Sequence, residues 1–216
     1  MRALNQKVLR DLWHLRGQVV AIALVIGSGV AVLIMALSTV EALDRTADAY
    51  YDRYRLADVF ATVTRAPEHV AERIRAIPGV RSVQTRIVRY ATLDVEGLRE
   101  PVMGQIVSLP DAGAELLNQL VLRSGRRPQA RSDDEVVLNE PFAEAHGLVP
   151  GDRLSAVLNG HKKEFVVVGT ALSPEFIYSL GPGSLMPDDH RFGVLWMSRS
   201  ALAAAFDLKG AFKDVT

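Results

Sequence analysis

The clearest hydropathy pattern of this chain is an apolar run close to its N-terminus. Residues 19–40 read VVAIALVIGSGVAVLIMALSTV and contain no charged side chain. A helix over this run would be roughly 33 Å long, which is enough to cross a hydrocarbon core of about 30 Å. The sequence therefore predicts one transmembrane helix over residues 19–40.

Two alternatives to a membrane span are a buried core helix and a cleaved signal peptide. Core helices rarely continue this far without a polar face. Ala36-Leu37-Ser38 has the small-x-small pattern of a weak cleavage site. The apolar region of a signal peptide, however, spans about 7–15 residues, and this run is longer. A membrane span fits the length of the run better than either alternative.

The segment before the span is basic and amphipathic. Helical spacing places one apolar stripe on Leu4, Val8, Leu12 and Leu15. Four basic side chains and a tryptophan of the interfacial type lie mostly outside this stripe: Arg2, Lys7, Arg10, Trp13 and Arg16. We predict that residues 1–18 form a cytoplasmic head in which these five residues contact the membrane surface. An ordinary positively charged flank is the alternative. The same charge bias places residues 41–216 on the extracytoplasmic side.

Small residues recur every four positions within the predicted span. Ala23, Gly27 and Ala31 would stack on one face of the helix, where they leave room for a second helix backbone. We predict a helix–helix contact at these three positions. Because Gly and Ala are common in membrane helices, the same pattern also fits a helix without a partner.

The residues beyond the span indicate a stalk and then an α+β domain. Residues 41–57 combine helix-forming and charged residues without Gly or Pro, which predicts a helical stalk. Strands are predicted over 58–64, 80–93, 102–109, 135–138, 154–158, 164–169 and 192–197. Helices are predicted from Pro67 to Ile77 and over 112–119, 141–145 and 199–206, with Asn139 and Gly147 as caps of the third. Asn159-Gly160 is a strong hairpin signal. Residues 58–216 should therefore form an α+β domain with largely antiparallel sheet.

Composition limits the function further. The chain has 25 basic and 25 acidic residues, so it lacks the basic excess that is typical of nucleic-acid binders. It contains no cysteine, which excludes a disulfide framework, a thiolate metal site and a cysteine nucleophile.

The sequence offers no convincing catalytic, metal or cofactor site. It has no GxxxxGK[ST] phosphate loop, no HExxH pair and no GxSxG elbow. Asp188-Asp189-His190 is the best local cluster, but consecutive side chains rarely converge on one point, so we interpret it as a solvated loop.

A cluster of basic residues could suggest anion binding: Arg123, Arg126, Arg127 and Arg131. We expect these arginines to pair with Asp133, Asp134 and Glu135 on an exposed loop.

Four short motifs follow one another in the second half of the chain. They are LRSGRRP (Leu122–Pro128), DEVVLNE (Asp134–Glu140), GLVPGD (Gly147–Asp152) and VVVG (Val166–Gly169). This succession resembles the MacB-like periplasmic core domain. The order of head, span, stalk and outer body resembles the N-terminal half of MacB/FtsX-type ABC transporter permeases, a group that includes the lipoprotein-releasing permeases. Each motif is a strand, a cap or a turn, so no catalytic residue is implied.

The resemblance implies a mechanotransmission role in the plasma (inner) membrane. Its implied partners are a separate cytoplasmic ATPase, which binds ATP, and a second permease copy or paralogue. The resemblance offers this ATPase as an alternative to the membrane surface for the contact made by five head residues: Arg2, Lys7, Arg10, Trp13 and Arg16. The other expected partners are the lipid membrane and an adaptor or substrate outside it. No nucleic-acid partner is expected. The outer domain would contain a smaller subdomain near 80–130. These permeases have four or more spans, so we expect this chain to be the N-terminal part of one.

The alternatives are a single-pass anchored binding or adaptor module and, third, an anchored enzyme. The resemblance leaves open the substrate, the direction of transport, the identity of the ATPase and whether the dimer is homo- or heteromeric.

Overall fold

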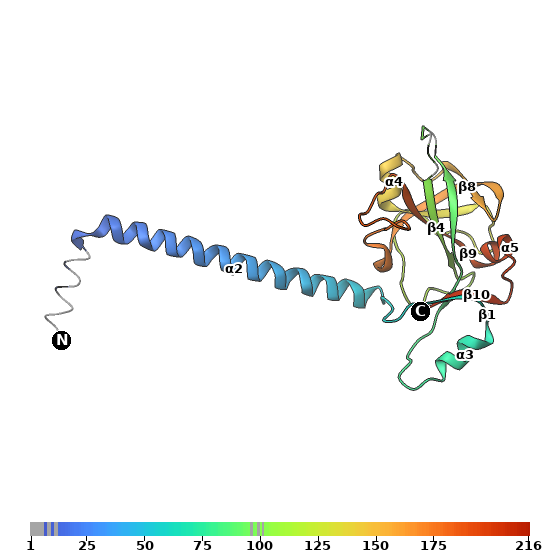
Figure 1. Ribbon diagram of the computed structural model, residues 1–216, viewed down its shortest axis with the longest axis horizontal. Coiled ribbons are helices and arrows are strands. Elements are labelled where there is room, and N and C mark those ends of the chain that lie inside the picture. The colour runs from blue at the N-terminus through green and yellow to red at the C-terminus, as the bar shows by residue number, and fades with distance from the viewer. Residues whose placement is uncertain (1–6, 8–9, 11–12, 96, 99, 101) are drawn as a thin grey trace. The chain divides into compact units, whose positions relative to one another are not determined.

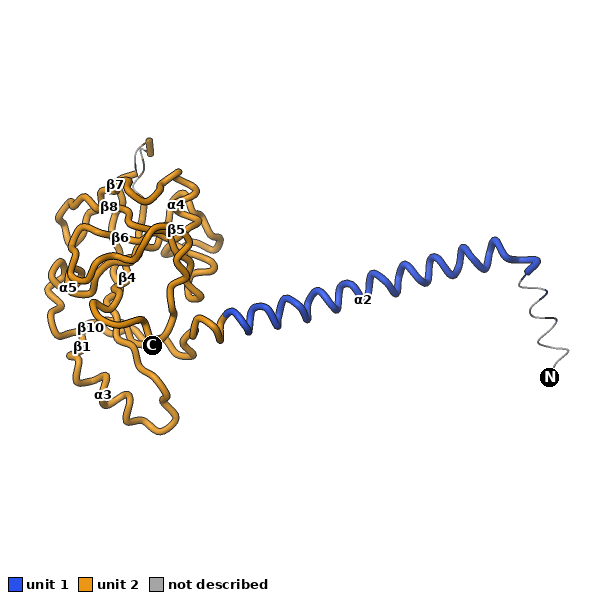
Figure 2. The backbone as a smooth tube through the Cα atoms, turned by 180° about the vertical axis from the view of Figure 1, so that it is seen from behind, with its two compact units in different colours: residues 1–50 blue, residues 51–216 orange. Residues whose placement is uncertain are grey.

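The fold combines one long helix with an α+β body. The computed structural model describes residues 7, 10, 13–95, 97, 98, 100 and 102–216. Helix α2 (Arg16–Arg53) precedes all the strands (Figure 1). The chain divides into two compact units, residues 1–50 and residues 51–216 (Figure 2). The strands and the shorter helices belong to the second unit, and the predicted α+β class is confirmed.

Helix α2 contains 38 residues, and none of them is buried. Within the described part of the chain, it is the one helix that is long and apolar enough to cross a membrane. The hydroxyl of Ser28 donates to the carbonyl of Val25 at 2.9 Å, and that of Thr39 donates to Met35 at 2.8 Å. These hydroxyl groups are therefore satisfied inside the helix, as a lipid environment requires. The helix continues past Val40 to Arg53 without a break.

The main sheet of the second unit has seven strands in the order β5-β8-β6-β9-β4-β3-β7. Their bounds are β3 (Val88–Asp94), β4 (Val102–Leu109), β5 (Val121–Gly125), β6 (Glu135–Asn139), β7 (Arg153–Leu158), β8 (His161–Leu172) and β9 (Phe192–Ser198). The β4–β9 and β6–β8 pairs are parallel, and the other pairs are antiparallel. Because β7 also pairs with β8, the ladder returns to β8 and closes on itself. Strands of the closed ladder contribute most residues of a buried core cluster, among them Phe165 and Leu195, and α4 adds Phe142 to it.

A second sheet has three strands in the order β1-β10-β2, both pairs antiparallel. The strands are β1 (Ala61–Pro67), β2 (Thr85–Arg86) and β10 (Ala211–Val215). Helix α3 (His69–Arg75) packs on it through Ala71, which shares a core cluster with Phe212. Helices α4 (Glu140–His146) and α5 (Arg199–Ala205) and the short 3₁₀ helix η1 (Pro174–Phe176) complete the unit.

The predicted helix over residues 112–119 is wrong. Gln84 explains why, because its side-chain oxygen accepts the backbone N–H groups of Leu116 at 2.7 Å and Leu117 at 2.9 Å. Asn118 also adopts a left-handed φ of 50°, which no right-handed helix contains. In a helix, these N–H groups would donate to backbone carbonyls of the preceding turn. Here their acceptor is a side chain more than thirty positions away along the chain.

Several predicted strands differ from the observed ones. The strand predicted over 58–64 lies at 61–67. The strand predicted over 80–93 divides into β2 and β3, because the chain leaves the small sheet and enters the large one after Arg86. The loop expected after residue 119 contains β5, and β10 was not predicted at all. Both omissions concern strands whose partners lie far away along the chain.

Other local predictions agree with the structure. The strand over 102–109 has the predicted bounds, and Asn159-Gly160 joins β7 to β8 in a hairpin. Gly147 ends α4 in the left-handed conformation, with φ 65°. Asn139 occupies the N-cap position, but its side chain makes no cap hydrogen bond and instead accepts the N–H of Val194 at 2.7 Å.

Candidate functional site

The three residues of the predicted helix–helix contact lie on α2. Ala23, Gly27 and Ala31 are all exposed. A side chain added at Gly27 would meet nothing within 4 Å. This face is therefore open to a second helix, and the contact itself stays a prediction.

The basic head is described only in part. Lys7, Arg10, Trp13 and Arg16 are exposed, and Arg16 is the first residue of α2. Arg2 lies outside the described residues. Exposure is compatible with contact to lipid or to an ATPase, and that contact also stays a prediction.

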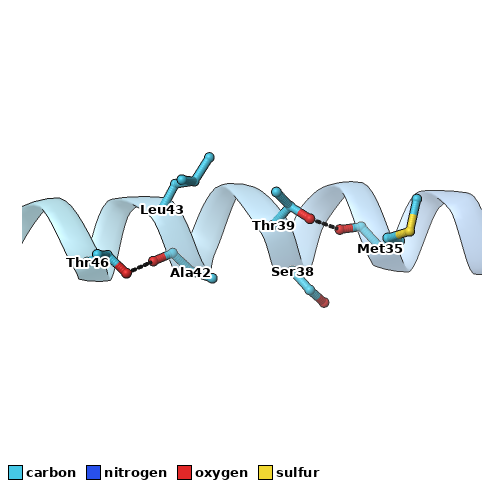
Figure 3. Close-up of a pocket in the computed structure, with 6 residues that line it drawn as sticks. All are labelled: Met35, Ser38, Thr39, Ala42, Leu43 and Thr46. Atoms are coloured by element: carbon cyan, nitrogen blue, oxygen red, sulfur yellow. Dashed lines mark hydrogen bonds between the residues drawn. The ribbon is translucent and has the colours of Figure 1, made fainter. Parts of the chain in front are cut away.

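A shallow groove runs along α2 between Met35 and Thr46 (Figure 3). Ser38, Thr39, Ala42 and Leu43 complete its lining, so it is formed by a single helix. The hydroxyl of Thr46 donates to the carbonyl of Ala42 at 2.7 Å, as Thr39 does to Met35. With these hydroxyl groups occupied, the groove offers mainly apolar surface and does not enclose a ligand.

The Asp188-Asp189-His190 segment lies beside a shallow depression at the end of α4. Asp188 accepts the backbone N–H of His190 at 3.1 Å, and the Nε2 atom of His146 lies 3.1 Å from the His190 carbonyl oxygen. Burial lowers the pKa of the His146 imidazole despite that hydrogen bond. Among the residues that the structure describes, no three His, Asp or Glu side chains gather to hold a metal ion. The geometry is that of a hydrogen-bonded loop.

The arginine-rich segment pairs only partly as predicted. Arg126 and Glu135 form the expected ion pair at 2.6 Å. Arg127 pairs instead with Glu115 at 2.5 Å, and Arg123 pairs with Glu140 at 2.9 Å. For Arg123 the difference arises because this residue belongs to β5, which the sequence did not predict. These three arginines all have acidic partners. The fourth, Arg131, forms none of the ion pairs predicted for it among the described residues, and its backbone N–H donates to Asp111 at 3.3 Å.

Sequence reasoning missed the contacts that hold the entrance to the α+β body. Residues 54–57, which follow α2 within the second unit, lie against the loop that contains Asn118. The backbone N–H groups of Asn118 and Gln119 donate to the carbonyls of Arg55 at 2.8 Å and Tyr54 at 2.9 Å. The side-chain oxygen of Asn118 accepts the N–H of Ala57 at 2.9 Å. Ala57 and Asn118 are both buried.

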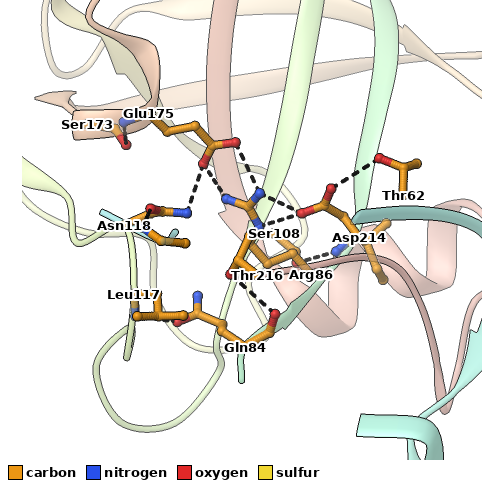
Figure 4. Close-up of polar contacts among 12 residues, drawn as sticks. Thr62, Gln84, Arg86, Ser108, Leu117, Asn118, Ser173, Glu175, Asp214 and Thr216 are labelled. Carbon is orange, nitrogen blue, oxygen red and sulfur yellow. Dashed lines mark hydrogen bonds and ion pairs between the residues drawn. The ribbon is translucent and has the colours of Figure 1, made fainter. Parts of the chain in front are cut away.

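A buried arginine continues this set of contacts (Figure 4). The Nδ2 atom of Asn118 donates to Glu175 at 3.2 Å, and both terminal nitrogens of Arg86 donate to the same carboxylate. Arg86 also donates to Asp214 from Nε at 2.9 Å and from Nη2 at 2.5 Å. The Arg86 side chain is 4% exposed, against 16% for Glu175 and 10% for Asp214. We call these four residues the junction cluster: Arg86, Asn118, Glu175 and Asp214.

The charges of the junction cluster compensate the cost of burial. Burial alone would lower the pKa of the Arg86 guanidinium, but the hydrogen bonds and charges of Glu175 and Asp214 outweigh it and raise that pKa. The guanidinium therefore stays charged between two carboxylates. Its planar fork suits two carboxylates at fixed angles. The cluster contains no nucleophile with a neighbouring base, so its geometry supports a structural connection rather than chemistry.

One sequence signal pointed to this cluster. Arg86 is a charged residue inside a strand pattern, directly before Ile87 and Val88, and a charge at such a position needs a buried partner. The partners themselves lie 89 and 128 positions away, so the sequence did not identify them.

The chain is similar to the outer domains of membrane transporters. The family model described as the MacB-like periplasmic core domain matches residues 19–210. The extracellular domain of the noncanonic ABC-type transporter YknZ from Gram-positive bacteria shares 14% sequence identity at a TM-score of 0.45, over 75% of this chain and 78% of that chain. The periplasmic region of MacB from Actinobacillus actinomycetemcomitans shares 14% identity at a TM-score of 0.39, over 69% of this chain and 62% of that chain. A comparison with curated proteins gives no match.

Proposed function

Because the chain belongs to the family of MacB-like periplasmic core domains of ABC-type transporter permeases, we propose that it couples ATP hydrolysis by a partner ATPase to movement of an outer domain. In this proposal it is the N-terminal part of a permease subunit, and a separate cytoplasmic ATPase drives the movement. The movement would serve export or the release of lipoprotein or lipid. The observation that supports this most is the extent of the family match, which includes both the apolar helix and the α+β body.

The proposed location is the plasma (inner) membrane, with the N-terminus in the cytoplasm. The apolar residues of α2 form the span, and Lys7, Arg10 and Arg16 precede it. Basic residues are retained on the cytoplasmic side of a span, which supports this orientation. The α+β body would then lie outside the cytoplasm.

The proposed partners follow from the role of a permease. The ATPase binds and hydrolyses ATP, so this chain itself uses no cofactor. A second permease copy or paralogue packs against Ala23, Gly27 and Ala31, because small residues permit close approach of membrane helices. The outer body contacts an adaptor or the substrate.

The proposed mechanism is mechanical. Helix α2 continues from the apolar run into a charged segment, and no Pro or Gly interrupts residues 30–53. Sharp kinks in helices are usually found at proline or glycine, so this segment is suited to transmit a displacement. The ATPase would move the head and the span, and the outer body would receive the movement.

The full-length permease, purified from its native membrane in mild detergent, tests the proposal. We expect an ABC ATPase to co-purify and to hydrolyse ATP in the complex. A fluorophore on the outer body should change its energy transfer to a lipid-anchored dye when ATP is added. A single-span protein without an associated ATPase would contradict the proposal and favour an anchored binding or adaptor module.

A further inference from the structure

Four segments that are distant in the sequence meet at the junction cluster. Arg86 ends β2 of the small sheet, and Asp214 lies in β10 of the same sheet. Glu175 lies in η1, directly after the longest strand of the large sheet. Asn118 contacts residues 54–57 at the entrance to the body. One buried set of polar contacts therefore connects the entrance segment with both sheets.

Asn118 connects two sides of this cluster through a single amide group. Its oxygen accepts the backbone N–H of Ala57. Its nitrogen donates to Glu175 (Figure 4). The two ends of an amide differ in hydrogen-bonding character, so both contacts fix the same orientation of the side chain. The left-handed φ of 50° suits asparagine better than most residues. The residue type and the backbone conformation thus agree with the bridging position.

Arg86 links the small sheet to η1, which follows strand β8 of the large sheet. Its guanidinium donates to Glu175 from one pair of nitrogens and to Asp214 from Nε and Nη2. Charge-assisted hydrogen bonds in a planar fork restrict both distance and direction. Since these side chains are largely buried, water cannot easily replace one partner with another.

We propose that the junction cluster makes residues 54–57 move as one body with the two sheets. Asn118 and Arg86 are then positioning residues for the coupling of ATP hydrolysis to movement of the outer domain. The inference deepens the proposed function and rests on it. The competing explanation is that the cluster only stabilises the fold, and a melting temperature does not separate the two. The separating measurement is whether ATP hydrolysis continues while movement of the body is lost.

The test uses the full-length permease with its ATPase in nanodiscs. Asn118→Leu removes both contacts of the amide, and Arg123→Leu is the matched control. Arg123→Leu also removes an ion pair, with Glu140 at 2.9 Å, but the Arg123 side chain is 53% exposed and lies in β5, outside the junction cluster. Spin labels at Asp52→Cys and His161→Cys, both exposed positions of the second unit, report the distance between the last turn of α2 and the β7–β8 hairpin. Asp52 directly precedes the entrance segment, so this distance follows the movement of that segment. A fluorophore at His161→Cys and a lipid-anchored dye report ATP-driven displacement.

The expected result has two parts. In Asn118→Leu, the distribution of Asp52–His161 distances should become about twofold broader, because a local restraint is lost. Its ATP-dependent change in energy transfer should fall by about fivefold or more, the lower end of typical coupling factors, while ATP hydrolysis continues. Arg123→Leu should match the wild type in both measurements.

Each contrary outcome is informative. A narrow distance distribution and a full energy-transfer change in Asn118→Leu would overturn the inference and leave the proposed function intact. If the wild type itself showed no ATP-dependent change, the proposed function would fail first. If Asn118→Leu does not fold, Asn118→Asp replaces it, because this variant keeps the acceptor for Ala57 and places a second carboxylate against Glu175. Normal coupling in Asn118→Asp would equally overturn the inference.

Discussion

Gly125 and Gly169 face each other as partners on the antiparallel strands β5 and β8, and neither has room for a side chain. A Cβ atom on Gly125 would lie 2.2 Å from the carbonyl oxygen of Val168. One on Gly169 would lie 2.6 Å from the carbonyl oxygen of Arg126. The LRSGRRP and VVVG motifs are thus the two sides of one close approach between backbones.

Gly125→Ala should lower the free energy of unfolding by about 3 kcal/mol, since a left-handed backbone costs about 1 kcal/mol and overpacking adds roughly 1–3. Gly183→Ala is the matched control, because Gly183 has a similar φ of 79° but open surroundings. It should lose only about 1 kcal/mol. Urea titration of the chain in detergent, followed by fluorescence of the buried Trp196, measures both values. Equal losses would mean that the backbones separate easily at Gly125.

Arg86→Met should be far more destabilising than Arg123→Met. The first substitution leaves Glu175 and Asp214 beside each other without their shared cation, and breaking a buried pair costs about 3–5 kcal/mol. Arg123 is half exposed, and an exposed ion pair contributes about 0–1 kcal/mol. The same urea titration separates the two. Similar losses in the two variants would show that the Arg86 ion pairs contribute no more than a surface pair.

Asp111 should stabilise the fold in a pH-dependent way. Its carboxylate accepts from the Ser198 hydroxyl at 2.5 Å and from the backbone N–H of Ser200 at 3.0 Å. Burial acts to raise the pKa of Asp111, but these hydrogen bonds and one from the Arg131 backbone outweigh it and lower that pKa. A carboxyl group whose pKa is lowered by folding stabilises the fold at every pH above its pKa in the unfolded state. This stabilisation is lost as the pH falls through the pKa of the folded state.

Asp111→Asn should therefore cost about 1 kcal/mol at pH 7, and the difference from wild type should shrink below about pH 4. Denaturation curves between pH 7 and pH 3 test this. Asp58→Asn, at an exposed position, should follow the wild type throughout. A difference at Asp111 that is constant down to pH 3 would mean that its ionised form is not the stabilising one.

The orientation in the membrane can be tested because the chain contains no cysteine. Lys7→Cys and His161→Cys are treated separately with a membrane-impermeant maleimide on intact cells. We expect labelling at position 161 alone, and labelling at both positions once the cells are permeabilised. Labelling of intact cells at position 7 would reverse the proposed orientation.

Gly27→Leu should weaken association of the permease subunits by about tenfold, because it fills the face on which small residues permit close approach. Gly29→Leu is the matched control. It adds the same side chain two residues further on, which is about 200° around the helix. Cross-linking yields in nanodiscs compare the two variants. If both weaken association equally, the Ala23–Gly27–Ala31 face is not the specific contact.

Sequence reasoning succeeded where neighbouring residues decide the conformation. The strand Val102–Leu109, the Asn159-Gly160 hairpin and the left-handed Gly147 all depend on residues within a few positions. The apolar helix is local in the same sense, because its length and composition are sufficient to predict it. The order of these local motifs also carried the resemblance to the family that the match over residues 19–210 shows.

The sequence by itself determined the membrane-type helix, the α+β class and the family, since these depend on local propensity and on the order of motifs. The tertiary structure decided the closure of the sheet through β7 and β8, the position of β10 and the junction cluster. It also decided that Leu116 and Leu117 bond to Gln84 instead of forming a helix. The physical reason is that buried polar groups must find partners in space. When those partners lie up to 128 positions away, no local pattern identifies them.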